Sequence, residues 1–183
     1  MKDGAAAKNR GYAPTAPLLK RQNAQRLEQI ERQMAAIEAE ILKQIHADAD
    51  LSRRFAILAS IPGVSAVTAF ALLIEMPELG ALEAQQAASL AGLVSAGLAP
   101  IARQSGRWTG HAFIRGGRAP VRRAVYMPAL VAARFNPDMK ATYDRLRAAG
   151  KPAKLALTAV MRKLIVLANA LLKANRTWTP KAA

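Results

Sequence analysis

Helical spacing of the apolar residues is the feature that most constrains the fold of this chain. Apolar residues recur three and four positions apart through most of the sequence, and no segment alternates apolar and polar residues as a half-buried strand does. In the last long segment, one predicted helical side carries Leu155, Val160, Leu164, Leu167 and Leu171. We therefore predict an all-α fold, and the sequence shows no internal repeat.

The first 50 residues predict a linker followed by one long helix. Residues 1–16 are rich in Ala, Gly, Pro and basic residues and lack periodicity, which is typical of a linker or a frayed end. The apolar residues that then follow at a/d spacing are Leu27, Ile30, Met34, Ile37 and Ile41. We predict a coiled-coil helix over residues 17–48, which pairs with a second chain through residues 17–45 or folds back on its own domain.

Residues 51–180 predict a helical domain that Pro and Gly divide into short elements. The predicted elements, in order, are helices over 51–60, 65–76 and 83–94, a loop over 95–117, and helices over 120–135, 137–149 and 152–174. Pro128 is expected to kink the helix that contains it. Asn136 is predicted to cap the next helix at its N-terminus, and Gly150 to end that helix.

The net charge of +15 is confined to one part of the chain. Residues 1–83 carry ten basic and ten acidic residues, whereas residues 84–183 carry seventeen basic residues and only Asp138 and Asp144 as acids. Arginine can bond two phosphate oxygens at once, so this asymmetry predicts binding to a polyanion. Nucleic acid is favoured over an acidic membrane, because the arginines near the middle of the chain are interleaved with Gly and Pro. A solvated surface that only keeps the protein soluble is the alternative.

What the chain lacks excludes other functional classes. It contains no cysteine, which excludes a disulfide scaffold and a thiolate metal site. Its two histidines, His46 and His111, lie far apart without an acidic cluster beside either, so no metal site is predicted. The N-terminus lacks the apolar core of a signal peptide, and the longest apolar runs are shorter than the roughly 20 residues that span a bilayer. These features fit a protein of the reducing cytoplasm and predict no membrane contact.

The first motif is a helix, a Pro-Gly turn and a second helix within residues 51–76. In a helix-hairpin-helix, a glycine lets the backbone approach a phosphate, and the N–H groups at the start of the second helix hold the anion. The candidate DNA contacts here are Gly63, Val64 and Ser65. Ser65 stands where such hairpins have a second glycine, and it can instead cap the second helix. A helix–turn–helix that only packs is an equal alternative.

The second motif is a basic loop over residues 95–123, in which Ser105 precedes Gly106. A serine hydroxyl is a poor nucleophile unless neighbouring groups activate it. The neighbours here are arginines, which can stabilise charge that develops on a phosphate: Arg103, Arg107, Arg115, Arg118, Arg122 and Arg123. His111 is a candidate proton carrier. A phosphate-binding loop with an incidental serine is the alternative.

Three aromatic residues have weaker functional interpretations. Tyr126 lies near Arg122 and Arg123 and is an alternative nucleophile, although a packed helix residue is favoured. Trp108 either stacks on a base or anchors the basic loop to the core. Trp178 is predicted to anchor the C-terminal tail.

These segments together resemble the IS110/IS116/IS902 family of insertion-sequence transposases over about residues 17–180. Three stretches match in order: Ile-Pro-Gly-Val at 61–64, Gly-Leu-x-Pro-x-x-x-x-Ser-Gly at 97–106, and Ile-Arg-Gly-Gly-x-x-x-x-Arg-Arg-Ala at 114–124. The coiled-coil segment before them and the helical tail after them fit the same family.

The resemblance implies a composite recombinase. Members of this family join an N-terminal RuvC-like domain with an acidic metal-binding tetrad, through a coiled coil, to a C-terminal domain with a serine nucleophile. They act as oligomers on DNA, and some are guided by a structured RNA from their own element. By this resemblance Ser105 attacks a DNA phosphodiester and forms a phosphoserine link, which keeps the bond energy for strand exchange. Mg²⁺ is expected only in the RuvC-like domain, and no cofactor is expected in this chain.

The main departure from the family is that the RuvC-like half is missing. We therefore expect a C-terminal transposase domain, either truncated, split or degenerate, that binds DNA and does not complete transposition alone. The alternative from another functional class is a non-enzymatic helix-hairpin-helix protein that binds DNA or RNA.

Overall fold

The structure is a computed structural model that describes residues 17–93, 104–105, 108–109 and 117–180. The chain divides into two units, residues 1–49 and 50–183, and each is described by itself. The described part contains seven helices and one pair of two-residue strands. The predicted all-α class is therefore confirmed, and the strand pair is an addition that the sequence did not suggest.

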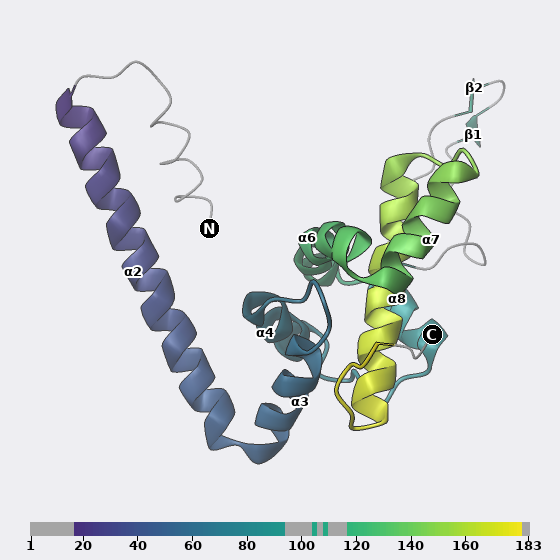
Figure 1. Cartoon of the computed structure of the whole chain (residues 1–183), viewed down its shortest axis with the longest axis horizontal. Helices are drawn as coiled ribbons and strands as arrows, with labels where there is room; N and C mark the ends of the chain where they lie inside the picture. Colours follow the sequence, from purple (N-terminus) through teal and green to yellow (C-terminus); the bar gives the residue numbers. More distant parts are fainter. Residues whose placement is uncertain (1–16, 94–103, 106–107, 110–116, 181–183) are drawn as a thin grey trace. The chain divides into compact units, whose positions relative to one another are not determined.

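In the described part of the first unit, one long helix, α2, spans Pro17–Ala47 (Figure 1). It begins at the predicted proline and ends directly before Asp48. Several of its apolar side chains are exposed, including Leu18, Met34 and, at 61% exposure, Ile37. The helix is as predicted, while its pairing in a coiled coil stays a prediction.

The second unit contains the remaining elements. They are α3 (Ala49–Ala59, whose first residue belongs to the first unit), α4 (Ala66–Glu75), α5 (Ala84–Leu90), β1 (Gln104–Ser105), β2 (Trp108–Thr109), α6 (Ala119–Phe135), α7 (Pro137–Ala148) and α8 (Ala153–Lys173). β1 and β2 pair antiparallel. α5 ends four residues before its predicted end, because Gly92 follows with a φ of +69° and turns the chain out of the helix.

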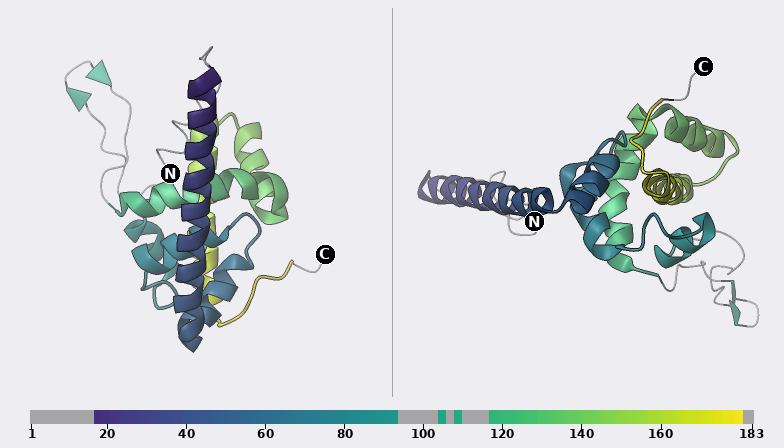
Figure 2. Two further views of the ribbon diagram at one scale, coloured as in Figure 1. Left: turned by 90° about the vertical axis from the view of Figure 1, so that its left-hand side faces the viewer. Right: turned by 90° about the horizontal axis from the view of Figure 1, so that it is seen from below.

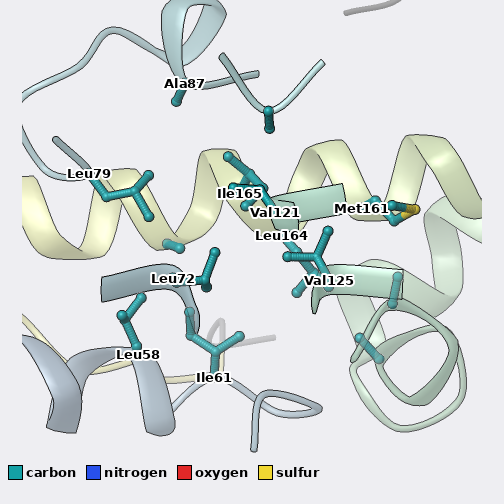
Figure 3. Close-up of a cluster of buried hydrophobic side chains, with 14 of the residues drawn as sticks. Leu58, Ile61, Leu72, Leu79, Ala87, Val121, Val125, Met161, Leu164 and Ile165 are labelled. Carbon is teal, nitrogen blue, oxygen red and sulfur yellow. The ribbon is translucent and has the colours of Figure 1, made fainter. Parts of the chain in front are cut away.

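Helix α8 forms the centre of this unit and packs against α5, α6 and α7, while α4 packs on α6 (Figure 1). Figure 3 shows Met161, Leu164 and Ile165 of α8 among apolar side chains from the surrounding elements. Ile165 is fully buried, and burying such a side chain stabilises the fold by about 1.5–3 kcal/mol. By length and composition α8 could also cross a membrane, but half of its apolar stretch is buried inside this unit.

Leu155 is a correction to the predicted apolar side of α8. It is 50% exposed, whereas Leu157 is buried. At 100° per residue Leu155 lies about 160° around the helix from Leu157, on the side away from the core. The four other predicted residues lie on the inward half of the helix, where Val160, Leu164 and Leu171 are buried.

Local signals for helix ends are confirmed. The Asn136 side chain caps α7 by accepting a hydrogen bond from the Met139 N–H at 3.3 Å. Gly150 follows α7 with a φ of +74°, the left-handed conformation that favours glycine after a helix. α6 continues as one helix through Pro128.

The C-terminal tail is tied back to α3. Arg53 donates to Asn175 through Nε to Oδ1 at 3.0 Å and through Nη2 to the backbone carbonyl at 2.7 Å. The Trp178 N–H donates to Ser60 Oγ at 2.8 Å, and the indole packs against the core. Trp178 is therefore the tail anchor that the sequence predicted.

Candidate nucleic-acid interface

The α3–α4 hairpin places Gly63 against helix α6. Gly63 has a φ of +99°, and a Cβ at this position would lie 3.0 Å from both Pro128 O and Ala132 N. The two helices of the hairpin also contact each other, because the rings of Phe55 in α3 and Phe70 in α4 stack with centroids 5.3 Å apart. The close approach that requires glycine is therefore an approach to protein, which supports the packing interpretation of this hairpin.

The residues after the turn lead into the N-terminus of α4. Ser65 is exposed and caps α4, because its Oγ accepts from the Thr68 N–H at 3.4 Å. The Val64 N–H is already used, since it donates to Ile61 O at 2.9 Å. The capping function of Ser65 is thus confirmed, and phosphate binding by Gly63, Val64 and Ser65 stays a prediction.

Arg118 is held by acceptors from a neighbouring turn. Its guanidinium donates to both carboxylate oxygens of Glu78, through Nη1 to Oε2 at 2.9 Å and through Nη2 to Oε1 at 2.7 Å. Nη1 also donates to the backbone carbonyl of Glu75. The hydrogen bonds from Arg118 lower the pKa of Glu78 to about 2. The pair is therefore ionised at neutral pH, and Arg118 has fewer donors left for DNA than its sequence position suggested.

The two ends of the stretch that contains Ser105 meet at one place, which we call the segment base: Leu90, Ala91 and Gly92 on one side, Gly117 and Arg118 on the other. A Cβ on Gly117 would lie 2.3 Å from both Gly92 Cα and Gly92 N. The Arg118 N–H donates to Leu90 O at 2.8 Å. Leu90 to Gly92 and Gly117 to Arg118 therefore lie side by side, although 24 residues separate Gly92 from Gly117 in the sequence.

Arg122 and Arg123 lie one turn into α6, next to the segment base. The Arg122 guanidinium donates from Nη1 to Ala91 O at 3.3 Å. Arg123 is exposed and makes no ion pair with the described residues. The start of α6 thus brings together Arg118, Arg122 and Arg123, of which Arg123 is best placed to meet a ligand.

Ser105 lies in the strand pair between the two ends of this stretch. Its backbone pairs with Trp108, and Gln104 pairs with Thr109. The predicted loop therefore contains a short antiparallel ladder around the candidate nucleophile. Arg103, Arg107 and Arg115 lie outside the described residues, as does His111.

Tyr126 is more exposed than the sequence suggests. The sequence favours a packed helix residue at this position, but the side chain is 44% exposed. α6 buries Val121, Val125 and Ala129, which leaves Tyr126 on the outward side. Because it follows Arg123 by three positions, the two side chains share one face of the helix.

Acidic residues do not gather into a metal site in the part of the chain that the structure describes. No group of three or more His, Asp or Glu side chains there could hold a metal ion. Glu78 instead neutralises Arg118, and Glu83 pairs with Lys173 at 2.8 Å. Glu78 and Glu83 therefore pair with basic side chains of the same unit.

Sequence reasoning missed the residues that close the segment base. Gly117 was visible as part of a Gly-Gly pair, but nothing local marked Gly92, 25 positions earlier, as its neighbour. Glu78 was likewise counted only as one of ten acids in the neutral part of the chain. Only the packing of the turn after α4 against the start of α6 reveals its pairing with Arg118.

Comparison with known proteins points to one family. The model of the transposase IS116/IS110/IS902 family matches residues 55–144, which include the α3–α4 hairpin, Ser105 and all of α6. The pilin gene-inverting protein of Moraxella bovis is 31% identical over 148 residues, which cover 78% of this chain and 44% of that protein. A 43.6 kDa protein of insertion element IS110 from Streptomyces coelicolor is 33% identical over 145 residues, covering 79% of this chain and 34% of that protein.

A third relative is also a protein of an insertion element. A 42 kDa protein of insertion element IS900 from Mycobacterium paratuberculosis is 39% identical over 93 residues, half of this chain and 23% of that protein. This chain spans less than half the length of each of these relatives. Over residues 55–144, the chain belongs to the IS116/IS110/IS902 family of transposases.

Proposed function

We propose that this chain binds DNA around the segment base and that Ser105 is the nucleophile of a DNA recombination reaction. The observation that carries the proposal is the contact between the two sides of the segment base, because this contact attaches the stretch with Ser105 directly to the start of α6. Arg122 and Arg123 lie there. The family match covers all three residues, and DNA transposition or recombination is the activity that this family and the gene-inverting relative support.

The proposed chemical step is a transesterification. Ser105 Oγ forms a bond to the phosphorus of a DNA phosphodiester, one phosphorus–oxygen bond to deoxyribose breaks, and the proton of the hydroxyl is transferred to the departing oxygen. Guanidinium groups stabilise the charge that develops on the phosphoryl oxygens. The product is a phosphoserine diester, so the reverse attack by another DNA hydroxyl rejoins strands without an external energy source.

The partners in this proposal are DNA, a second copy of the chain and, as in some members of the family, a structured RNA. Mg²⁺ would act with acidic residues of a RuvC-like domain, supplied with or beside this chain. Within this chain, the proposed work is to bind the phosphodiester backbone and to supply the nucleophile.

Binding to DNA is expected to depend steeply on salt. If about six phosphates are neutralised, the logarithm of the association constant should fall against the logarithm of salt concentration with a slope near −5. Fluorescence anisotropy of the full chain with a labelled 30-base-pair duplex measures this slope. Affinity that does not change between low and high salt would contradict an arginine-based interface.

Self-association is expected to run through α2. Ile37 is 61% exposed and Ile30 lies on the same predicted seam. Changing Ile30 and Ile37 to Asp would place charges in a paired seam, which is costly. Sedimentation should then show the monomer mass where the unchanged protein is a larger species. A matched control replaces the exposed Gln29 and Gln33 with Asp, outside the seam, and should leave the mass unchanged.

A further inference from the structure

More of the excess charge lies outside the basic loop than within it. Residues 95–123 carry six arginines and no acid. Residues 134–176 carry ten basic and two acidic residues, an excess of eight positive charges. The loop also loses cationic character at its base, since Arg118 is neutralised by Glu78. A single anion-binding loop therefore does not account for the charge of the second unit.

The turn that joins α7 to α8 concentrates part of this charge. We call it the basic turn, and its four cationic residues are Arg145, Arg147, Lys151 and Lys154. All four are exposed. Arg147 Nη1 donates to Lys151 O at 2.6 Å, and the Lys151 N–H donates to Leu146 O at 3.0 Å, so the end of α7 and the turn are folded tightly together.

Nothing in the described part of the chain neutralises the basic turn. The ammonium groups of Lys151 and Lys154 and the guanidinium of Arg145 make no ion pair or hydrogen bond with the described residues. A Cβ on Gly150, in the middle of the turn, would meet nothing within 4 Å, so the turn projects into open space. Asp144 is the one nearby acid in sequence, and it pairs with Lys140 at 2.5 Å.

The start of α8 adds to the positive potential. The first turn of α8 contains no acidic residue, and its N-cap is Pro152, which makes no side-chain cap hydrogen bond. Acidic residues stabilise a helix when they lie near its positive N-terminal end, whereas lysines there destabilise it. Lys151 and Lys154 therefore repel the dipole as well as each other, and an anion would relieve both repulsions.

The basic turn and the segment base belong to different elements of the second unit, the junction of α7 with α8 and the start of α6. α6 contains 17 residues, and at 1.5 Å per residue its two ends lie about 25 Å apart. The segment base adjoins the first end, and α7 begins directly after the second. Both views in Figure 2 show the start of α6 and helix α7 at opposite ends of α6.

We propose that the basic turn is a second binding surface for the phosphate backbone of a nucleic acid. It binds one length of backbone at the junction of α7 and α8 while the segment base holds another. Phosphate fits this surface because four exposed cationic side chains and the start of a helix without an acidic residue both favour an anion there. The inference goes beyond the proposed recombination chemistry and does not require Ser105 to be a nucleophile.

The test compares two double variants of the full chain that each remove two positive charges. Arg145→Gln with Lys154→Gln changes the basic turn, and Lys20→Gln with Arg176→Gln changes two exposed residues outside it that make no ion pair with the described residues. Salt dependence of binding is measured with a 30-base-pair DNA duplex and, in a second arm, with a 30-base-pair RNA hairpin. Thermal unfolding followed by circular dichroism checks that both variants fold.

The basic-turn variant should make the salt slope shallower by about 1.8 in at least one arm, at about 0.9 for each phosphate that the variant no longer neutralises. The arm that responds identifies the nucleic acid. The control variant should leave the slope within error of the unchanged protein. Equal changes of slope in both variants would show that binding follows total charge alone and would overturn the proposal. A slope that the basic-turn variant leaves unchanged in both arms would also overturn the proposal. This holds even if the basic turn were then found to bind vesicles of anionic phosphatidylserine, because a membrane is not a nucleic acid. A serine adduct is measured separately, so failure of the recombination chemistry does not touch this result.

Discussion

Ser105→Ala is expected to abolish a covalent protein–DNA adduct while leaving most DNA binding intact. The chain is incubated with a nicked suicide duplex and the separate RuvC-like domain that the proposed function requires. Adducts are then counted after denaturing electrophoresis. In the proposed reaction the hydroxyl oxygen of Ser105 bonds to phosphorus, so removing it should leave no route to the adduct, whereas it should add little to affinity beside several arginines. A well-placed arginine in phosphoryl transfer is worth on the order of 10³–10⁵ in rate, so Arg123→Ala should slow adduct formation strongly.

Two further variants assign the adduct to a side chain. Ser89→Ala removes an exposed hydroxyl of α5 and should change neither binding nor the adduct. Tyr126→Phe should also leave the adduct unchanged. An adduct that survives Ser105→Ala and disappears in Tyr126→Phe would transfer the role to the exposed tyrosine on the outward side of α6. The absence of an adduct in the unchanged protein, with normal binding, would favour a non-enzymatic binding module.

Gly63→Ala is expected to destabilise the second unit by about 2–5 kcal/mol. A φ of +99° disfavours any side chain, and the new Cβ would lie 3.0 Å from two backbone atoms of α6. Left-handed backbone costs about 1–2 kcal/mol for a residue with a Cβ, and forcing extra volume into a packed contact costs about 1–3 kcal/mol more. Urea denaturation followed by circular dichroism measures the decrease in stability.

Gly150→Ala is the matched control for this substitution. Gly150 has a φ of +74°, but its Cβ would meet nothing within 4 Å. Only the conformational cost of about 1–2 kcal/mol should then remain. If Gly63→Ala lost no more stability than Gly150→Ala and instead weakened DNA binding, the glycine would face a phosphate rather than α6.

Features set by neighbouring residues could be predicted from the sequence. The N-caps at Ser65 and Asn136 need only a side chain and the backbone three residues later, and both are confirmed. The left-handed Gly150 after α7 is a signal of the same local kind. Helix boundaries were accordingly correct within one or two residues for most elements, with α5 as the exception.

Features that depend on distant contacts could not be predicted. The approach of Gly117 to Gly92 and the pairing of Arg118 with Glu78 join positions 25 and 40 residues apart. The Ser105–Trp108 ladder involves too few residues for an alternating pattern to show. For Leu155, apolar character suggested burial, but its angular position on the helix decides its exposure. The candidate site is therefore recognisable in sequence by its motifs, while its closure depends on the fold.

The ties between the tail and α3 have a consequence for the order in which the chain acquires its structure during synthesis. Arg53 bonds to Asn175, and Ser60 to Trp178, across separations of 122 and 118 residues. A ribosome that adds about 5–20 residues per second needs roughly 6–24 s to make the later partners after the earlier ones. Helix α2 is complete long before then. If α2 self-associates as proposed, a nascent chain could pair with a neighbouring copy while its second unit is still unfolded, so that chains made on one messenger would be paired before either has folded around α8.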